Sequence, residues 1–180
     1  MKDTQHGYSA LSIWLHWLAA ITMIVLFVLG QAAEDAADAE RKTLLGLHIS
    51  IAMSMYLILV ARIGWRLHNG RPTLPSQQSK PLMLLAHWVP VILLAGLALM
   101  LVSGPIMVWT KGFPINIFGL ISLPSPLGKM DTLHEVFEVV HKIGAKLLFF
   151  AFLLHILGVL KHLVVDRDNT LKRMLVPIKK

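Results

Sequence analysis

Residues 10–30 read ALSIWLHWLAAITMIVLFVLG, a run that contains no charged side chain. A helix that crosses a bilayer core of about 30 Å needs about 20 apolar residues, so this run predicts a membrane-spanning helix. Three later stretches are similar, and together they predict spans at about residues 10–30, 43–62, 81–102 and 141–162. We therefore expect an all-α fold, an integral membrane four-helix bundle in which residues 1–180 form a single domain.

The composition agrees with a membrane protein. Hydrophobic residues make up 56% of the chain and charged residues 15%, against roughly 45–50% and 25% in soluble domains. The chain has no cysteine, which excludes disulfide scaffolds, thiolate zinc sites, iron–sulfur clusters and cysteine nucleophiles. The fourth span is the least regular, because it includes Lys142 and Lys146, and charges inside a span usually have a function.

The positive charges lie unevenly about the spans. Those on the side of the termini are Lys2, Arg62, Arg66, Arg71, Lys80, Lys161, Arg167, Lys172, Arg173, Lys179 and Lys180, and those on the other side are Arg41, Lys42, Lys111 and Lys129. Lysine and arginine in short loops favour the cytoplasmic side, so both termini are predicted to be cytoplasmic. The formal net charge of +7 then indicates contact with membrane lipid, and we expect no binding to nucleic acid.

Histidines are unusually frequent for so apolar a chain. His141 and His155 are 14 residues apart, almost four helical turns, so they share one face about 21 Å apart along the axis. Gly144 and Gly158 follow them by three residues each. These glycines either make room for a flat macrocycle beside the histidines or serve helix packing.

Depth in the membrane supplies a partner for each of these histidines. His16 and His155 lie near the cytoplasmic ends of their spans, whereas His48 and His141 lie near the outer ends. Two histidines on facing helices can ligate one haem iron, and filling both axial positions favours electron transfer over oxygen binding. The pattern predicts two non-covalent b-type haems, with His87 as an alternative to His16 at the inner one.

Further basic residues gather at the cytoplasmic end. Arg62 and Arg66 lie 14 and 18 residues after His48, on its face of the helix, where they either pair with the propionates of the inner haem or anchor the helix. His162, His87 and Lys80 lie near the same boundary. We interpret them as lining a quinone-binding pocket, although His162 has an alternative role as an anchor at the head groups.

Several segments resemble one known family. They are YSALSIWLHW (8–17), LLGLHISIAMSMYLILVARIGWRL (44–67), LAHW (85–88) and HKIGAKLLFFAFLLHILGVLKHLVVDRDNTLKRML (141–175). Over nearly its whole length the chain resembles bacterial di-haem cytochrome b561, which is also similar to the cytochrome b subunits of nickel hydrogenases.

The resemblance implies an electron carrier of the bacterial inner membrane with two b haems, held by His16 with His155 and by His48 with His141. It is strongest to superoxide oxidases, which pass electrons to ubiquinone, and it would place the quinone near His162. The protein would then be either a superoxide:ubiquinone oxidoreductase or a pure electron carrier.

The loops on the outer side do not favour an anionic substrate. Segments 31–42 and 103–138 carry more acidic than basic residues, so they would not steer superoxide toward this face. We expect the loop 103–133 to lie on the surface as turns or a short helix, either as a cap or as the rim of an outer electron-uptake site. Two other functions stay open: a haem-bearing anchor for a dehydrogenase or hydrogenase partner, and a haem-free, histidine-lined metal or proton transporter.

Overall fold

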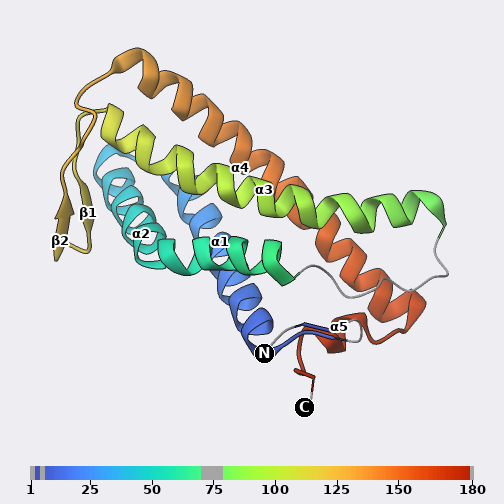
Figure 1. Ribbon diagram of the computed structural model, residues 1–180. Coiled ribbons are helices and arrows are strands. Elements are labelled where there is room, and N and C mark those ends of the chain that lie inside the picture. Colours follow the sequence, from blue (N-terminus) through green and yellow to red (C-terminus); the bar gives the residue numbers. More distant parts are fainter. Residues whose placement is uncertain (1–2, 5–6, 70–78, 179–180) are drawn as a thin grey trace.

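Four long helices dominate the computed structural model, which describes residues 3–4, 7–69 and 79–178. They are α1 (Ala10–Asp35), α2 (Asp38–Asn69), α3 (Lys80–Thr110) and α4 (Asp131–Leu160) (Figure 1). All four are long and apolar enough to cross a membrane, which confirms the predicted membrane four-helix bundle. Each helix extends beyond its expected span, and the bounds of the membrane-crossing portions remain predictions. Lys2, Arg71, Lys179 and Lys180 of the charge comparison lie outside the described residues.

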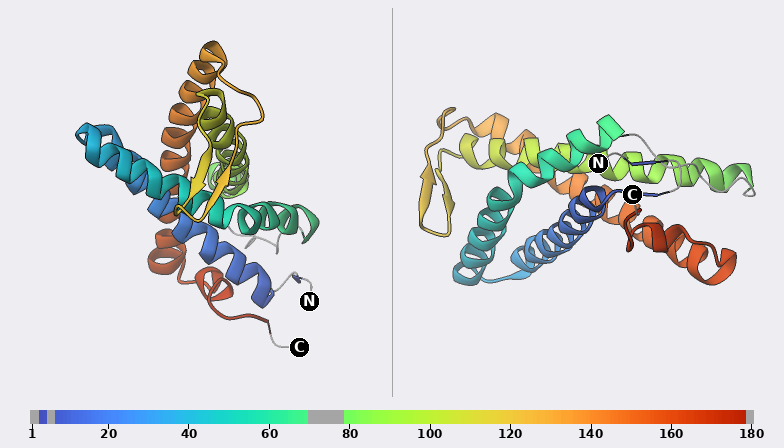
Figure 2. Two further views of the ribbon diagram at one scale, coloured as in Figure 1. Left: turned by 90° about the vertical axis from the view of Figure 1, so that its left-hand side faces the viewer. Right: turned by 60° about the horizontal axis from the view of Figure 1, so that its bottom comes forward.

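The helices associate in two pairs, α1 with α2 and α3 with α4 (Figures 1 and 2). The apolar core lies where α1, α2 and α3 meet, and its buried members are Ala19, Leu59, Leu97 and Leu101. Between α1 and α4, the rings of Phe27 and Phe149 are stacked with centroids 4.5 Å apart. The face of α4 that is turned to α1 therefore meets it through aromatic side chains.

Large apolar side chains also cover the outside of the bundle. Leu57, Leu147 and Phe150 are among those that are exposed. In water such a surface would drive association, whereas in a bilayer lipid chains cover it at no cost. The exposed apolar surface thus follows from the membrane location.

A small hairpin replaces the turns or short helix that we expected in the loop between α3 and α4. Strands β1 (Ile115–Ile117) and β2 (Ile121–Leu123) pair antiparallel, with Asn116 opposite Ser122. The expectation was wrong because Phe118 and Gly119 adopt positive φ angles of 51° and 72°, and two such residues form the turn that best suits a tight hairpin.

The hairpin is fastened to α2 (Figure 1). The Ser50 hydroxyl donates to the carbonyl of Asn116 at 3.2 Å and accepts from the backbone N–H of Phe118 at 3.0 Å. Ile115 is only 1% exposed. Since Ser50 follows His48 by two residues, these contacts place the hairpin at the end of the bundle that holds His48.

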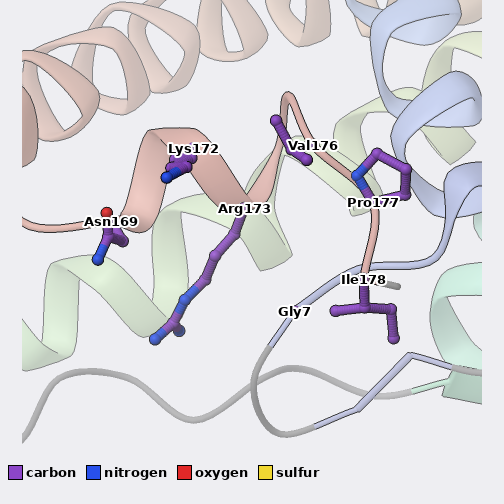
Figure 3. Close-up of a pocket in the computed structure, with 7 residues that line it drawn as sticks. All are labelled: Gly7, Asn169, Lys172, Arg173, Val176, Pro177 and Ile178. Atoms are coloured by element: carbon purple, nitrogen blue, oxygen red, sulfur yellow. The ribbon is translucent and has the colours of Figure 1, made fainter. Parts of the chain in front are cut away.

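The two ends of the chain lie together (Figure 1). After α4 the chain forms a π-helix, η1 (Lys161–Asp166), and a short helix, α5 (Thr170–Arg173). The backbone N–H of Ile178 donates to Tyr8 O at 3.1 Å, and Trp17 Nε1 donates to Met174 O at 2.8 Å. A shallow cavity of about 340 Å³ lies between Gly7 and the basic tail (Figure 3).

Candidate functional site

At one end of the bundle, His16 of α1 faces His155 of α4. Their ring centroids are 6.2 Å apart and the ring planes are inclined by 63°. Both side chains are only partly exposed. Helix depth predicted this pair, and the structure brings its two members together.

Toward the other end, His48 of α2 faces His141 of α4 in the same manner. The ring centroids are 6.4 Å apart and the planes are inclined by 72°. The two α4 histidines are 14 residues apart, so the inner and outer pairs are separated by about 21 Å along this helix. In a bilayer core of about 30 Å, this separation is large enough for the two pairs to lie in opposite leaflets.

The outer histidines have fixed ring orientations. His48 Nδ1 lies 2.9 Å from the carbonyl of Leu26, and His141 Nδ1 lies 2.9 Å from the hydroxyl of Ser103. A carbonyl only accepts hydrogen bonds, so His48 carries its proton on Nδ1 and leaves Nε2 free to ligate. Metal-ligating histidines are commonly held through their other nitrogen in this way.

The spacing of both pairs fits a haem iron. Metal–imidazole bonds are about 2 Å long, so two imidazoles on opposite sides of one iron have ring centres roughly 6 Å apart. In addition, Trp109 Nε1, near the end of α3, is the one side-chain polar atom that is buried without a hydrogen-bond partner in the described part of the chain.

Glycines next to the histidine rings are not the two that the sequence singled out. A Cβ atom at Gly144 would come within 2.5 Å of Met100 Cε, so Gly144 serves the packing of α3 against α4. At Gly158 a Cβ would meet nothing within 4 Å. A Cβ at Gly30 would instead lie 3.7 Å from the His48 ring, and one at Gly104 would lie 3.4 Å from His141 Cε1.

Two arginines stand beside the inner pair. Arg62 and Arg66 of α2 both lie within electrostatic range of His16, and Arg62 is half-buried. Their charges would match carboxylates of a group bound between His16 and His155, because arginine forms strong paired hydrogen bonds with carboxylates. At the outer pair, by contrast, the Lys142 ammonium donates to Glu138 at 2.8 Å.

A polar network beside the inner pair was missed in the sequence. The Ser12 hydroxyl donates to the Asp3 carboxylate at 2.7 Å and accepts from Trp65 Nε1 at 2.7 Å. Asp3 also lies within electrostatic range of Arg62. These contacts tie the N-terminal segment to α1 and α2 one turn before His16, but residues so far apart in the chain give no periodic signal.

His162 has close acidic partners in the turn that follows it. Its Nδ1 lies 2.7 Å from Asp168 Oδ2 and 3.3 Å from Asp166 Oδ2. Partial burial opposes the charge of Asp168, but hydrogen bonds from Thr170 and His162 outweigh it and hold the pKa of this carboxyl below its usual value. Asp168 is therefore an ionised acceptor at neutral pH.

The other two residues of the expected quinone pocket lie on α3. Lys80 begins this helix, and His87 is exposed with its ring 5.3 Å from that of Trp88. The start of α3 and the end of α4 diverge after the two helices cross (Figures 1 and 2). A common pocket of His162, His87 and Lys80 remains a prediction.

His134, in the first turn of α4, has two close partners. Its Nδ1 donates to the carbonyl of Met107 at 2.8 Å, and its Nε2 lies 3.5 Å from Glu138 Oε2. The side chain is 14% exposed. The side chain therefore joins the start of α4 to the end of α3.

Taken together, the fold and the two histidine pairs define a multi-pass membrane protein whose interior can hold porphyrin-bound iron. A family model described as prokaryotic cytochrome b561 matches residues 7–177, and the chain belongs to this family. Membership indicates b-type haem binding and electron transfer in a membrane, and it does not favour a haem-free transporter.

Two curated relatives cover nearly the whole chain. Cytochrome b561 homolog 2 of Escherichia coli (strain K12) is 30% identical over 179 residues, which are 96% of this chain and 93% of the relative. A protein named "probable superoxide oxidase CybB", from Yersinia pestis, is 27% identical over 171 residues, 93% of this chain and 95% of the relative. The second name agrees with an oxidoreductase role.

Proposed function

We propose that the chain transfers electrons across the bacterial inner membrane through two b haems, between the outer side and membrane ubiquinone. The observation that carries this proposal is the pair of histidine–histidine contacts, at 6.2 and 6.4 Å between ring centroids. His16 with His155 would ligate the inner haem, and His48 with His141 the outer one. When bound, the haems supply reversible one-electron chemistry.

The residues around each pair have separate tasks. Arg62 and Arg66 would hold the propionates of the inner haem, and Ser103 and the Leu26 carbonyl would orient the outer ligands. With two histidines holding each haem, the protein would leave the iron no free position for oxygen, which suits electron transfer rather than oxygen activation. At the inner end, His162, His87 and Lys80 would receive the quinone head group.

Superoxide is our candidate for the electron donor. The name of the Yersinia pestis relative supports this choice. Lys142, which lies outside the acidic segments counted above, is 2.8 Å from Glu138 and offsets one of the acidic charges there. Two superoxide anions and one quinone, with two protons, would yield two oxygen molecules and one quinol.

The experiment is a haem assay followed by rapid kinetics on the purified protein. We expect two non-covalent b haems per chain by pyridine haemochrome, reduction of these haems by a superoxide pulse, and reoxidation by a soluble ubiquinone analogue. A haem content near zero or one would contradict the two-haem path. Haems that superoxide leaves oxidised, but that a second co-purifying subunit reduces, would instead favour the role of membrane anchor for a dehydrogenase or hydrogenase.

A further inference from the structure

The chain has an unusual backbone where α4 ends. Residues Lys161–Asp166 form a π-helix, a rare conformation that often occurs at functional sites. Arg167 then adopts the left-handed conformation with φ 51°, which costs a non-glycine residue free energy and persists only where the surroundings enforce it. The result is a turn in which the backbone N–H of Asp168 donates to His162 O at 3.2 Å.

This turn brings a carboxylate to one nitrogen of His162. The Nδ1···Oδ2 distance to Asp168 is 2.7 Å, and Oδ1 of the same carboxylate accepts from the backbone N–H of Thr170 at 2.8 Å. An ionised carboxylate only accepts hydrogen bonds, so Nδ1 of His162 must carry its proton. The other nitrogen, Nε2, is therefore the atom that can take up and release a proton.

Charged residues of η1 and α5 lie around the pair. Asp166 lies 3.3 Å from His162 Nδ1, and its carboxylate accepts from Lys161 Nζ at 2.6 Å. The charged residues of the adjoining helix α5 are Lys172 and Arg173, which line the cavity next to Gly7 (Figure 3). His162 itself is 14% exposed, so it is sheltered and still reaches the surface.

Three ligand-type atoms of His162, Asp166 and Asp168 lie within 4.8 Å of one another. Lys161 and Thr170 already engage the two carboxylates. The two carboxylates thus have hydrogen-bond donors within the protein, and they are suited to holding the protonated nitrogen of His162.

We propose that His162 and Asp168 form a proton-transfer site that supplies protons from the cytoplasmic surface to the bound quinone as it is reduced. The proposal deepens the proposed function and rests on it, because that function places the quinone near His162. Reduction of one ubiquinone takes two electrons from the haem path and two protons. Each proton leaves Nε2 of His162 to form an O–H bond on the quinone, and water then reprotonates Nε2. Asp168 is a positioning residue, which accepts from Nδ1, orients the imidazole and places a negative charge beside it.

The test compares two electron acceptors with the haem-loaded protein. Ubiquinone analogues need protons when they are reduced, whereas ferricyanide accepts an electron without a proton. In Asp168→Asn we expect reoxidation by the quinone to be about tenfold slower at pH 8 and close to wild type at pH 6. Reoxidation by ferricyanide should stay unchanged at both pH values, and Asp168→Glu should restore much of the quinone rate.

Two more variants separate the chemistry from the fold. His162→Gln can still donate to Asp168 but cannot transfer a proton, so quinone reoxidation should be slow at every pH, on the order of a hundredfold. Val165→Ala changes an exposed side chain of the same π-helix and should behave as wild type. Both variants should retain the haem spectrum of the parent.

The outcomes distinguish this inference from the function on which it rests. Wild-type haems that quinone cannot reoxidise at all would contradict the proposed function. If quinone reoxidises the wild-type haems, and Asp168→Asn and His162→Gln keep the wild-type rates and pH profiles, only the proton-transfer site is overturned. If the variants are slowed equally with quinone and with ferricyanide, the defect lies in electron transfer, and the proton-transfer site is overturned as well.

Discussion

The role of each of the four paired histidines as a haem ligand can be tested by a single substitution. The rings of His16 and His155, and those of His48 and His141, lie at the distance that one iron between them requires. Replacing His48 or His141 by alanine should remove only the outer haem, and replacing His16 or His155 only the inner haem. Haem content and redox-resolved visible spectra measure this. Loss of the inner haem in His87→Ala, with retention in His16→Ala, would show that the pairing is wrong.

The Ser103 hydroxyl is the partner of His141 Nδ1 at 2.9 Å, and it is fully buried. Removing such a second partner of a metal ligand typically weakens metal binding by 10- to 100-fold. We expect Ser103→Ala to bind the outer haem on the order of tenfold more weakly, measured as haem transfer to an apo-haem protein. Ser54→Ala, which removes a hydroxyl bonded within α2, is the matched control. Equal haem loss from both variants would argue against a specific role for Ser103.

At the scale of single elements, the contact of α3 with α4 depends on Gly144. A Cβ there would lie 2.5 Å from Met100 Cε and 3.0 Å from Leu99 Cδ2. These are the ends of flexible side chains that can yield to a methyl group, whereas a leucine overpacks the site at a cost of about 1–3 kcal/mol. Gly144→Leu should therefore lower the thermal unfolding midpoint in detergent, followed by circular dichroism. Gly46→Ala, where a Cβ meets nothing within 4 Å, should not lower it, because alanine favours a helix more than glycine does. An unaltered midpoint in Gly144→Leu would show that the two helices separate easily at this position.

The turn after η1 depends on the conformation of Arg167. Glycine adopts positive φ without steric cost, whereas a β-branched residue is strongly disfavoured there. Arg167→Gly should keep the Asp168 N–H to His162 O hydrogen bond, while Arg167→Val should weaken it by roughly 1–2 kcal/mol. Hydrogen exchange of the Asp168 amide should then be about tenfold faster in the valine variant. Equal exchange in both variants would show that the conformation of Arg167 does not hold the turn.

For the molecule as a whole, the direction of electron transfer depends on which end faces the cytoplasm. The chain contains no cysteine, so single cysteines can report their side of the membrane. Leu120 in the hairpin is 87% exposed and Leu175 in the tail is 55% exposed. A membrane-impermeant maleimide should label Leu120→Cys in intact spheroplasts, and Leu175→Cys only after lysis. The reverse pattern would place the His16–His155 pair on the outer side and contradict the proposed direction.

Much of this architecture follows from the sequence alone. Hydropathy and helix length are local properties, and they suffice to predict four membrane helices. The 14-residue spacing of His141 and His155, combined with depth in the bilayer, also predicts which histidines face each other. The rise per residue and the ends of a membrane helix together fix the depth of each of its residues. The structure brings together the same two pairs, although their role as haem ligands stays a proposal.

Tertiary structure decided the surroundings of these residues. Gly30 and Gly104 lie against histidine rings that belong to other helices, and Ser103 meets His141 across the α3–α4 contact. Such partners depend on how the helices pack, and no periodicity within one helix encodes the packing. The hairpin at Phe118 and the turn at Arg167 were missed for a related reason. Both depend on single residues with positive φ, a conformation that non-glycine residues adopt only when the rest of the fold imposes it.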